Sequence, residues 1–375
     1  MSKINYICLD DKPSEVGLAV SRLSRSHANL NIKCETPLPL KDELKRLKCL
    51  RKGRKLDGLI VDLRLDQTAP AGQIPVNYKA QQLASQLHTA MAERLIPDFP
   101  IVLWSITQKL ARSFDRDLSS HTLFDLVINK EKLLGKESLQ ATNLVSLVLG
   151  YRKICMTARN SCFWREVLSA PHSLELDHRI GESLTSTLPA HILAKYILDN
   201  IIWKSGPLID QSTLCARLGI TEASFRASQL AKALLRGASY KGAFCDAWPR
   251  WWWANIEKWW QSKNPNLPSI LSLTAQERVD IIKKVFKVKN IVIAQPVARK
   301  YSKRFTTICQ CTMEPLDPID GFMLSSVGLE PWHDRLYVST KVALQPRKHR
   351  FEGQLDAKEI ERLKPLRKMK MRNES

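Results

Sequence analysis

Three carboxylates, one hydroxyl and one ammonium group of this sequence follow directly after short apolar runs. They are Asp10, Asp11, Asp62, Ser105 and Lys130. Neighbouring carboxylates repel one another unless a cation joins them, and hard oxygen ligands of this kind suit Mg²⁺. A carboxylate beside Mg²⁺, with a hydroxyl and an ammonium group nearby, can accept a phosphoryl group. If the fold brings these residues together, they predict phosphoryl-transfer chemistry.

The apolar runs that precede these residues are typical of buried parallel strands. They cover residues 4–9, 58–61, 101–104 and 123–129. Helical segments separate them: Pro13 fits the first turn of a helix, and residues 79–95 place their apolar side chains on one helical face. Strands that alternate with helices predict an α/β fold with a doubly wound, five-stranded parallel sheet. Ligands of such sheets bind at the carboxyl ends of the strands, where the polar residues are expected.

The first 150 residues resemble the receiver domains of bacterial response regulators. The resemblance lies in the Asp-Asp-x-Pro start at Asp10 and in Asp62, Ser105 and Lys130, which follow the predicted strands three, four and five. It implies that Asp62 is the phosphoacceptor, that Ser105 is the switch hydroxyl and that Lys130 binds the phosphate. The implied ligands of Mg²⁺ are Asp10, Asp11, Asp62 and the backbone carbonyl of Arg64. A histidine kinase is the partner that this family implies.

Three features depart from the family pattern. Receivers usually carry Pro after the phosphate-binding Lys and an aromatic residue three positions before it; here these are Glu131 and Val127. The loop of residues 67–78, next to Asp62, is longer than usual. These departures favour a second hypothesis, in which the receiver fold is a docking scaffold for protein partners and is not phosphorylated.

Length and composition bound the remaining expectations. A chain of 375 residues with 44% hydrophobic residues is long enough for two or three domains. We expect a receiver-like domain over residues 1–150, a helical domain over 151–240 and a Trp-rich, basic region over 241–375. No apolar run is long enough for a membrane span, so we expect a soluble, cytoplasmic protein with no membrane partner. The nine cysteines form no Cys-x-x-Cys pair, which indicates free thiols in a reducing compartment.

The net charge of +21 favours a polyanionic partner, and most of the excess follows residue 150. Residues 208–221 resemble the first helix and turn of a helix-turn-helix or winged-helix element, with Gly219 in the turn. The following segment, 222–235, would then be the recognition helix and would present Arg226 and Gln229 to DNA. A plain pair of packed helices is the alternative reading of the same pattern.

Further candidates for nucleic-acid contacts lie towards the C-terminus. The basic clusters contain Arg299, Lys300, Lys303, Arg304, Arg347 and Lys348, where phosphate contacts are expected. Six tryptophans fall between residues 248 and 260. Their indoles can stack on single-stranded bases, but we favour packing within the protein or against a partner.

Motifs for other chemistry are absent from the sequence. The Cys309–Cys311 pair has a spacing that does not suit structural zinc, so no zinc site is expected. There is neither a Gly-rich phosphate loop nor a His-Glu-x-x-His motif, and we expect no enzymatic activity beyond accepting and losing a phosphoryl group. The leading hypothesis is a two-component signalling protein: a phosphorylated receiver that controls a DNA-binding output region. The alternative is an adaptor subunit of a larger bacterial assembly, for example a defence or mobile-element system.

Overall fold

The computed structural model describes residues 3–68, 75–111, 118–158, 162–262, 265–345 and 354–374. Contacts between residues divide the chain into two compact units. The first unit comprises Met1–Ser173, Asp177–Asp199 and Lys241–Trp248, and the second comprises Leu174–Leu176, Asn200–Tyr240 and Pro249–Ser375. The three-part division drawn from the sequence stays a prediction. In the described part of the chain, no helix combines the length and hydrophobicity needed to cross a bilayer.

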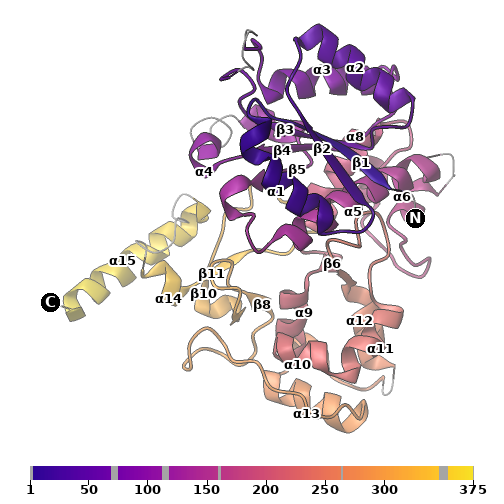
Figure 1. The fold of residues 1–375 in the computed structure, drawn as a ribbon. Helices are drawn as coiled ribbons and strands as arrows, with labels where there is room; N and C mark the ends of the chain where they lie inside the picture. The colour runs from indigo at the N-terminus through magenta and orange to yellow at the C-terminus, as the bar shows by residue number, and fades with distance from the viewer. Residues whose placement is uncertain are drawn as a thin grey trace. The chain divides into compact units, whose positions relative to one another are not determined.

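A parallel sheet of five strands, in the order β2-β1-β3-β4-β5, forms the centre of the first unit (Figure 1). Its strands are β1 (Ile4–Leu9), β2 (Leu30–Glu35), β3 (Gly58–Asp62), β4 (Ile101–Ser105) and β5 (Leu126–Asn129). The predicted α/β fold with five parallel strands is therefore confirmed. The edge strand β2 is not among the apolar runs of the sequence, because only alternate residues near its start are buried.

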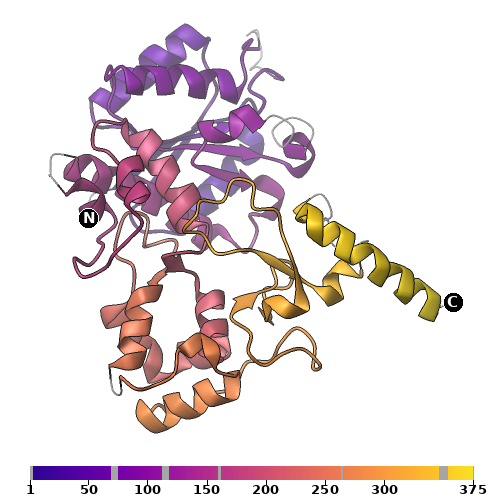
Figure 2. The ribbon, with the colours of Figure 1, turned by 180° about the vertical axis from the view of Figure 1, so that it is seen from behind.

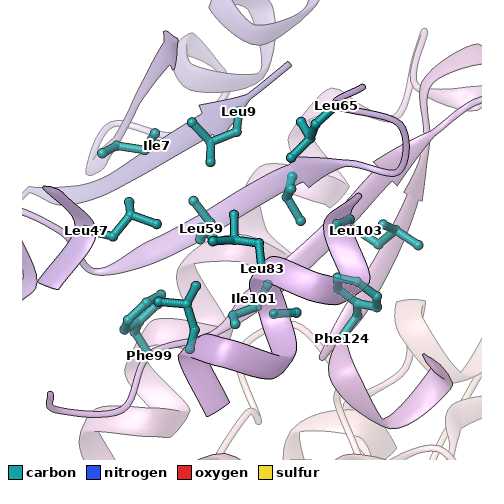
Figure 3. Packing of buried hydrophobic residues seen from close by; sticks show 14 of the residues in the cluster. Ile7, Leu9, Leu47, Leu59, Leu65, Leu83, Phe99, Ile101, Leu103 and Phe124 are labelled. Carbon is teal, nitrogen blue, oxygen red and sulfur yellow. The ribbon is translucent and has the colours of Figure 1, made fainter. Parts of the chain in front are cut away.

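Two helices cover one face of this sheet, α2 (Leu40–Lys52) and α3 (Ala80–Ala92). Figure 3 shows Leu47 of α2 and Leu83 of α3 beside Leu59 and Leu103 of the central strands. All four side chains are fully buried. The continuous apolar runs seen in the sequence thus face helices rather than solvent, as expected for a parallel sheet.

The helices α1 (Pro13–Arg25) and α5 (Glu137–Thr157) pack together on the opposite face. The Tyr6 hydroxyl of β1 donates a hydrogen bond of 2.8 Å to the Leu144 carbonyl of α5. A Cβ atom at Gly58 would lie 2.2 Å from the Tyr6 ring, so only glycine fits at the start of β3. Pro13 stands at the start of α1, as predicted.

Shorter elements complete the first unit. They are α4 (Thr107–Lys109), η2 (Leu118–Leu123), η3 (Lys130–Lys132), α6 (Phe163–Val167), α7 (His178–Ser183) and α8 (Ala190–Ile197). The helix α8 packs against α5, and η4 (Leu198–Ile202) follows it. The strand predicted over 123–129 is shorter in the structure, because η2 extends to Leu123 and β5 begins only at Leu126.

The second unit is mainly helical, with three two-stranded sheets. Its helices are α9 (Gln211–Leu218), α10 (Glu222–Ala227), α11 (Gln229–Gly237), α12 (Trp253–Gln261), α13 (Ala275–Val285), α14 (Thr340–Ala343) and α15 (Ala357–Glu374), with the turns η5 (Ile270–Ser272) and η6 (Pro318–Asp320). Its strand pairs are β6 (Leu208–Ile209) with β7 (Trp251–Trp252), β8 (Thr307–Ile308) with β9 (Pro315–Leu316), and β10 (Gly321–Met323) with β11 (Tyr337–Ser339). Figure 2 shows α15 as the long C-terminal helix beyond α14.

The segment predicted as one recognition helix, 222–235, consists of two helices. The chain leaves α10 at Ser228, whose backbone is extended (φ −89°, ψ 158°), and α11 begins at the next residue. The Ser228 hydroxyl donates a hydrogen bond of 3.0 Å to the Phe225 carbonyl, which satisfies the end of α10. Ser228 and Ser224 are buried, so they do not form part of an exposed reading face.

The tryptophan cluster lies largely in the core of the second unit. Trp251, Trp252 and Trp260 are buried, and Trp259 stacks on Phe286 with 4.1 Å between ring centroids. The indole nitrogen of Trp260 donates to the Pro268 carbonyl at 2.9 Å. Buried indoles cannot stack on bases, so the packing interpretation accounts for these tryptophans.

Candidate functional site

The parallel sheet gathers the five predicted polar residues at one edge. Asp10 and Asp11 follow β1, Asp62 and Ser105 are the last residues of β3 and β4, and Lys130 directly follows β5. The strands β1, β3, β4 and β5 are consecutive neighbours, and the register pairs the ends of these strands with one another. Since all strands run in the same direction, their carboxyl ends share this edge.

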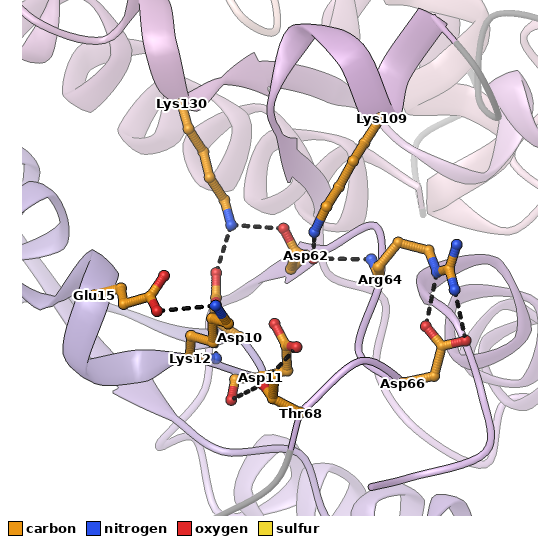
Figure 4. A network of polar contacts seen from close by, with 10 residues as sticks. All are labelled: Asp10, Asp11, Lys12, Glu15, Asp62, Arg64, Asp66, Thr68, Lys109 and Lys130. Atoms are coloured by element: carbon orange, nitrogen blue, oxygen red, sulfur yellow. Dashed lines mark hydrogen bonds and ion pairs between the residues drawn. The ribbon is translucent and has the colours of Figure 1, made fainter.

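Lys130 joins two of the carboxylates directly (Figure 4). Its Nζ donates hydrogen bonds of 2.6 Å to Asp10 Oδ2 and of 2.6 Å to Asp62 Oδ1. The side chains of Asp10 and Asp62 are only 2% and 1% exposed, and that of Lys130 is 18% exposed. Charge-assisted bonds at this distance are strong because little water screens them.

Asp62 has contacts on both of its carboxylate oxygens. Its Oδ2 accepts a hydrogen bond of 2.8 Å from the Arg64 backbone N–H, and Lys109 Nζ lies 3.9 Å from the same oxygen. Burial nevertheless raises the pKa of Asp62, against the lowering effect of Lys130. Burial alone would lower the pKa of Lys130, but Asp62 and Asp10 raise it overall. The site is therefore an ion-paired cluster in which Lys130 does not fully offset the cost of burying the Asp62 carboxylate.

Ser105 is fully buried at the end of β4. Within the described part of the chain, no atom accepts from or donates to its hydroxyl oxygen. A buried hydroxyl without a partner costs about 1–3 kcal/mol, and such a group in a native structure calls for an explanation. The Ser105 hydroxyl is thus free to bond a group that enters the site.

The donors of this edge fit Mg²⁺ in chemistry and in charge, because carboxylate oxygens are its preferred protein ligands and negative charge is in excess. Their present arrangement is different. Lys130 stands between Asp10 and Asp62, and the Asp11 carboxylate accepts a hydrogen bond of 2.7 Å from the Thr68 hydroxyl. As arranged here, the described residues contain no group of three or more His, Cys, Asp and Glu side chains that could hold a metal ion.

The two positions that depart from the receiver pattern have their own contacts. Glu131 accepts hydrogen bonds from the Thr107 backbone N–H (3.1 Å) and from the Thr107 hydroxyl, and Asn129 Nδ2 donates to that hydroxyl at 2.8 Å. These bonds tie the loop after β4 to the loop after β5. Val127 is 37% exposed on β5. The position therefore carries a small, partly exposed aliphatic side chain.

Sequence reasoning missed two residues of this cluster, Lys109 and Thr68. Lys109 is the last residue of the short helix α4, which follows β4, and no motif in the sequence indicates that its ammonium group reaches Asp62. Thr68 follows Asp62 in a loop, where nothing in the sequence predicts its contact with Asp11.

The predicted nucleic-acid residues that the structure describes belong to the second unit and are exposed. Arg226 is 63% exposed and forms an ion pair of 3.3 Å with Glu222 on the same helix. The other exposed cations of this set are Arg299, Lys300, Lys303 and Arg304. Arg347 and Lys348 lie outside the described residues, as does the side chain of Gln229.

Comparisons with known proteins add no family assignment. No protein-family model matches the chain, and no curated protein matches it either.

Proposed function

We propose that the first unit is a phosphoryl-accepting regulatory module with Asp62 as the acceptor. The observation that supports this most is the Asp10–Lys130–Asp62 bridge beside the buried, unpartnered hydroxyl of Ser105. A structural ion pair needs no free hydroxyl next to it, whereas a phosphoryl oxygen does.

The chemistry assigned to the site is a transfer from an acyl phosphate or phosphohistidine donor. An Asp62 carboxylate oxygen attacks phosphorus, the bond from phosphorus to the donor breaks, and the electron pair leaves with the donor. The Lys130 ammonium group and the Ser105 hydroxyl bind the transferred phosphoryl oxygens. A magnesium ion held by Asp10, Asp11, Asp62 and the Arg64 carbonyl would offset the charge of the incoming group.

The proposed output is nucleic-acid binding by the second unit, under control of the phosphoryl group. Its support is the overall charge of +21 and the exposure of Arg226, Arg299, Lys300 and Lys303. The helices α9 and α10, joined by a turn at Gly219 with φ 76°, provide a helix-turn-helix candidate. Phosphorylation of Asp62 would move the Lys130 ammonium group from the Asp62 carboxylate to a phosphoryl oxygen, so the contacts at this edge would differ between two states.

Intact mass spectrometry after incubation with acetyl phosphate and Mg²⁺ tests the acceptor. We expect a phosphate-sized increment in the wild type and in Asp66→Asn, and none in Asp62→Asn. Asp66 is the matched control because it is a neighbouring carboxylate that pairs with Arg64 at 2.8 Å. A folded wild type that takes up no phosphate contradicts the proposal.

The second candidate function is protein docking without phosphorylation, in an adaptor subunit. It is favoured by the small aliphatic surface at Val127 and by the Glu131–Thr107 tie. Salt dependence separates the two partner types: phosphate contacts predict a steep fall of affinity with salt, and a protein interface predicts a shallow one. Unchanged DNA affinity in Arg226→Ala would exclude α10 as the reading helix.

A further inference from the structure

A basic cavity of the first unit lies at the amino ends of the strands, whereas Asp62 lies at their carboxyl ends. It has a volume of about 680 Å³ and is lined by Pro97, one acid and five cations: Asp57, Lys3, Arg51, Lys52, Arg54 and Arg152. Lys3 precedes β1 and Asp57 precedes β3, whereas the predicted site lies after the same strands. The volume is within the range of small-molecule sites, about 300–1,000 Å³.

The cations of this cavity are not neutralised by the protein. Asp57 is the one acid among its lining residues, and its carboxylate is already engaged by Arg152 at 2.8 Å and by the Asn5 backbone N–H at 3.0 Å. Arg51 lies 3.9 Å from the same carboxylate. Lys3, Lys52 and Arg54 are exposed, and among the described contacts they have no acidic partner. An anion entering the cavity would find an excess of positive charge.

Part of this charge is held rigidly in place. The Arg51 guanidinium group donates to the carbonyls of Leu56 (2.9 Å), Pro97 (3.2 Å) and Asp98, and it lies 5.6 Å from the centroid of the Phe99 ring. A fixed guanidinium contributes a permanent positive field, since no conformational entropy is lost when a ligand binds.

Arg54 occupies a backbone position that normally belongs to glycine. Its φ is +57°, directly after the C-terminal cap of α2 at Gly53, and the Lys55 N–H donates to the Leu50 carbonyl. Cations at a helix C-terminus interact favourably with the helix dipole, which accounts for Arg51 and Lys52. That effect does not account for Lys3, which precedes β1, or for Arg152, which lies on α5.

We propose that this cavity binds a small free polyanion with two or more linked phosphate groups, an oligophosphate. Lys3, Lys52 and Arg54 supply the donors to phosphate oxygens, and Arg51 and Arg152 supply the field. The cavity favours a compact ligand over a nucleic-acid backbone because it is a hollow whose cations converge from α2, α5 and the start of β1 rather than a row along a surface. This site is independent of Asp62 and does not require its phosphorylation.

The test uses the full chain and calorimetric titration with inorganic tripolyphosphate. Arg54→Gly removes one cation while glycine suits the positive φ, so the variant keeps its fold. Arg94→Gly is the matched control: Arg94 follows α3 with φ +59°, the Leu95 N–H donates to the Ala90 carbonyl, and its side chain does not line this cavity. We expect Arg54→Gly to weaken binding about tenfold, the value of one charge-assisted hydrogen bond. Arg94→Gly and Asp62→Asn are expected to bind like the wild type.

Three results would overturn the proposal. The first is the absence of saturable binding by the wild type. The second is an equal loss in Arg54→Gly and Arg94→Gly, which would indicate diffuse attraction to the basic chain. The third is binding of a short DNA duplex that is weakened by Arg54→Gly while binding of tripolyphosphate is not. That result would assign the surface to nucleic acid.

Discussion

Replacing Lys130 with Met would remove the cation that joins two buried carboxylates. Its Nζ lies 2.6 Å from both Asp10 Oδ2 and Asp62 Oδ1, and these side chains are 2% and 1% exposed. Removing one partner of a buried ion pair costs about 3–5 kcal/mol, since the remaining charge stays buried. We expect the lower end, about 3 kcal/mol, because Lys130 is 18% exposed and Lys109 lies 3.9 Å from Asp62.

Hydrogen exchange followed by mass spectrometry suits this measurement, because a chain of two compact units need not unfold in a single step. The free energy of opening is read from peptides of β3 and β4, with Lys132→Met as the control for loss of an exposed lysine nearby. The double variant Lys130→Met/Asp62→Asn should recover about half of the loss, since it no longer buries an unpaired charge at Asp62. A loss below about 1 kcal/mol in the single variant, or no recovery in the double one, would refute the buried-pair reasoning.

Two more outcomes follow from buried groups of the first unit. Ser105→Ala should stabilise the sheet by about 1 kcal/mol in the same exchange experiment, because it removes an unpartnered hydroxyl, while it lowers phosphate uptake from acetyl phosphate. A destabilised Ala variant would mean that the hydroxyl has a structural partner. Burial raises the pKa of Asp125 to about 6, against hydrogen bonds from the Ile101 N–H and the Tyr151 hydroxyl. Because this folded-state pKa exceeds the ordinary 3.8, the contribution of Asp125 to stability should rise by about 2 kcal/mol as the pH falls from 7 to 4. Chemical denaturation at several pH values should show this rise in the wild type and a smaller one in Asp125→Asn; equal profiles would contradict the assignment.

The sequence predicted those strands in which a continuous apolar run coincides with burial in the structure. The strands β1, β3 and β4 are buried along most or all of their length, so their apolar runs were visible. The polar residues after them were visible for the same reason, because each interrupts an apolar run. The edge strand β2 has one face open near its start. Its sequence, LNIKCE, therefore alternates apolar and polar residues there and contains no continuous apolar run.

Other features depend on tertiary contacts that no local pattern contains. Arg278 lies on α13 and is fully buried, although an arginine in a helix is ordinarily exposed. Its guanidinium donates to the carbonyls of Leu273, Ala216 and Phe305 at 2.6, 3.2 and 2.8 Å, so it satisfies backbone groups of three separate segments.

The two opposite edges of the sheet explain why one candidate site was visible in the sequence and the other was not. A strand of six residues such as β1 spans about 20 Å, so residues just before and just after it lie far apart although they are close in sequence. Acids that interrupt an apolar run draw attention to its carboxyl end. The cations of the other edge come from a helix end, a turn and a distant helix, where lysine and arginine are ordinary surface residues. Only the parallel arrangement places Lys3, Arg54 and Arg152 around one cavity, and for this reason the anion site is a property of the fold rather than of a motif.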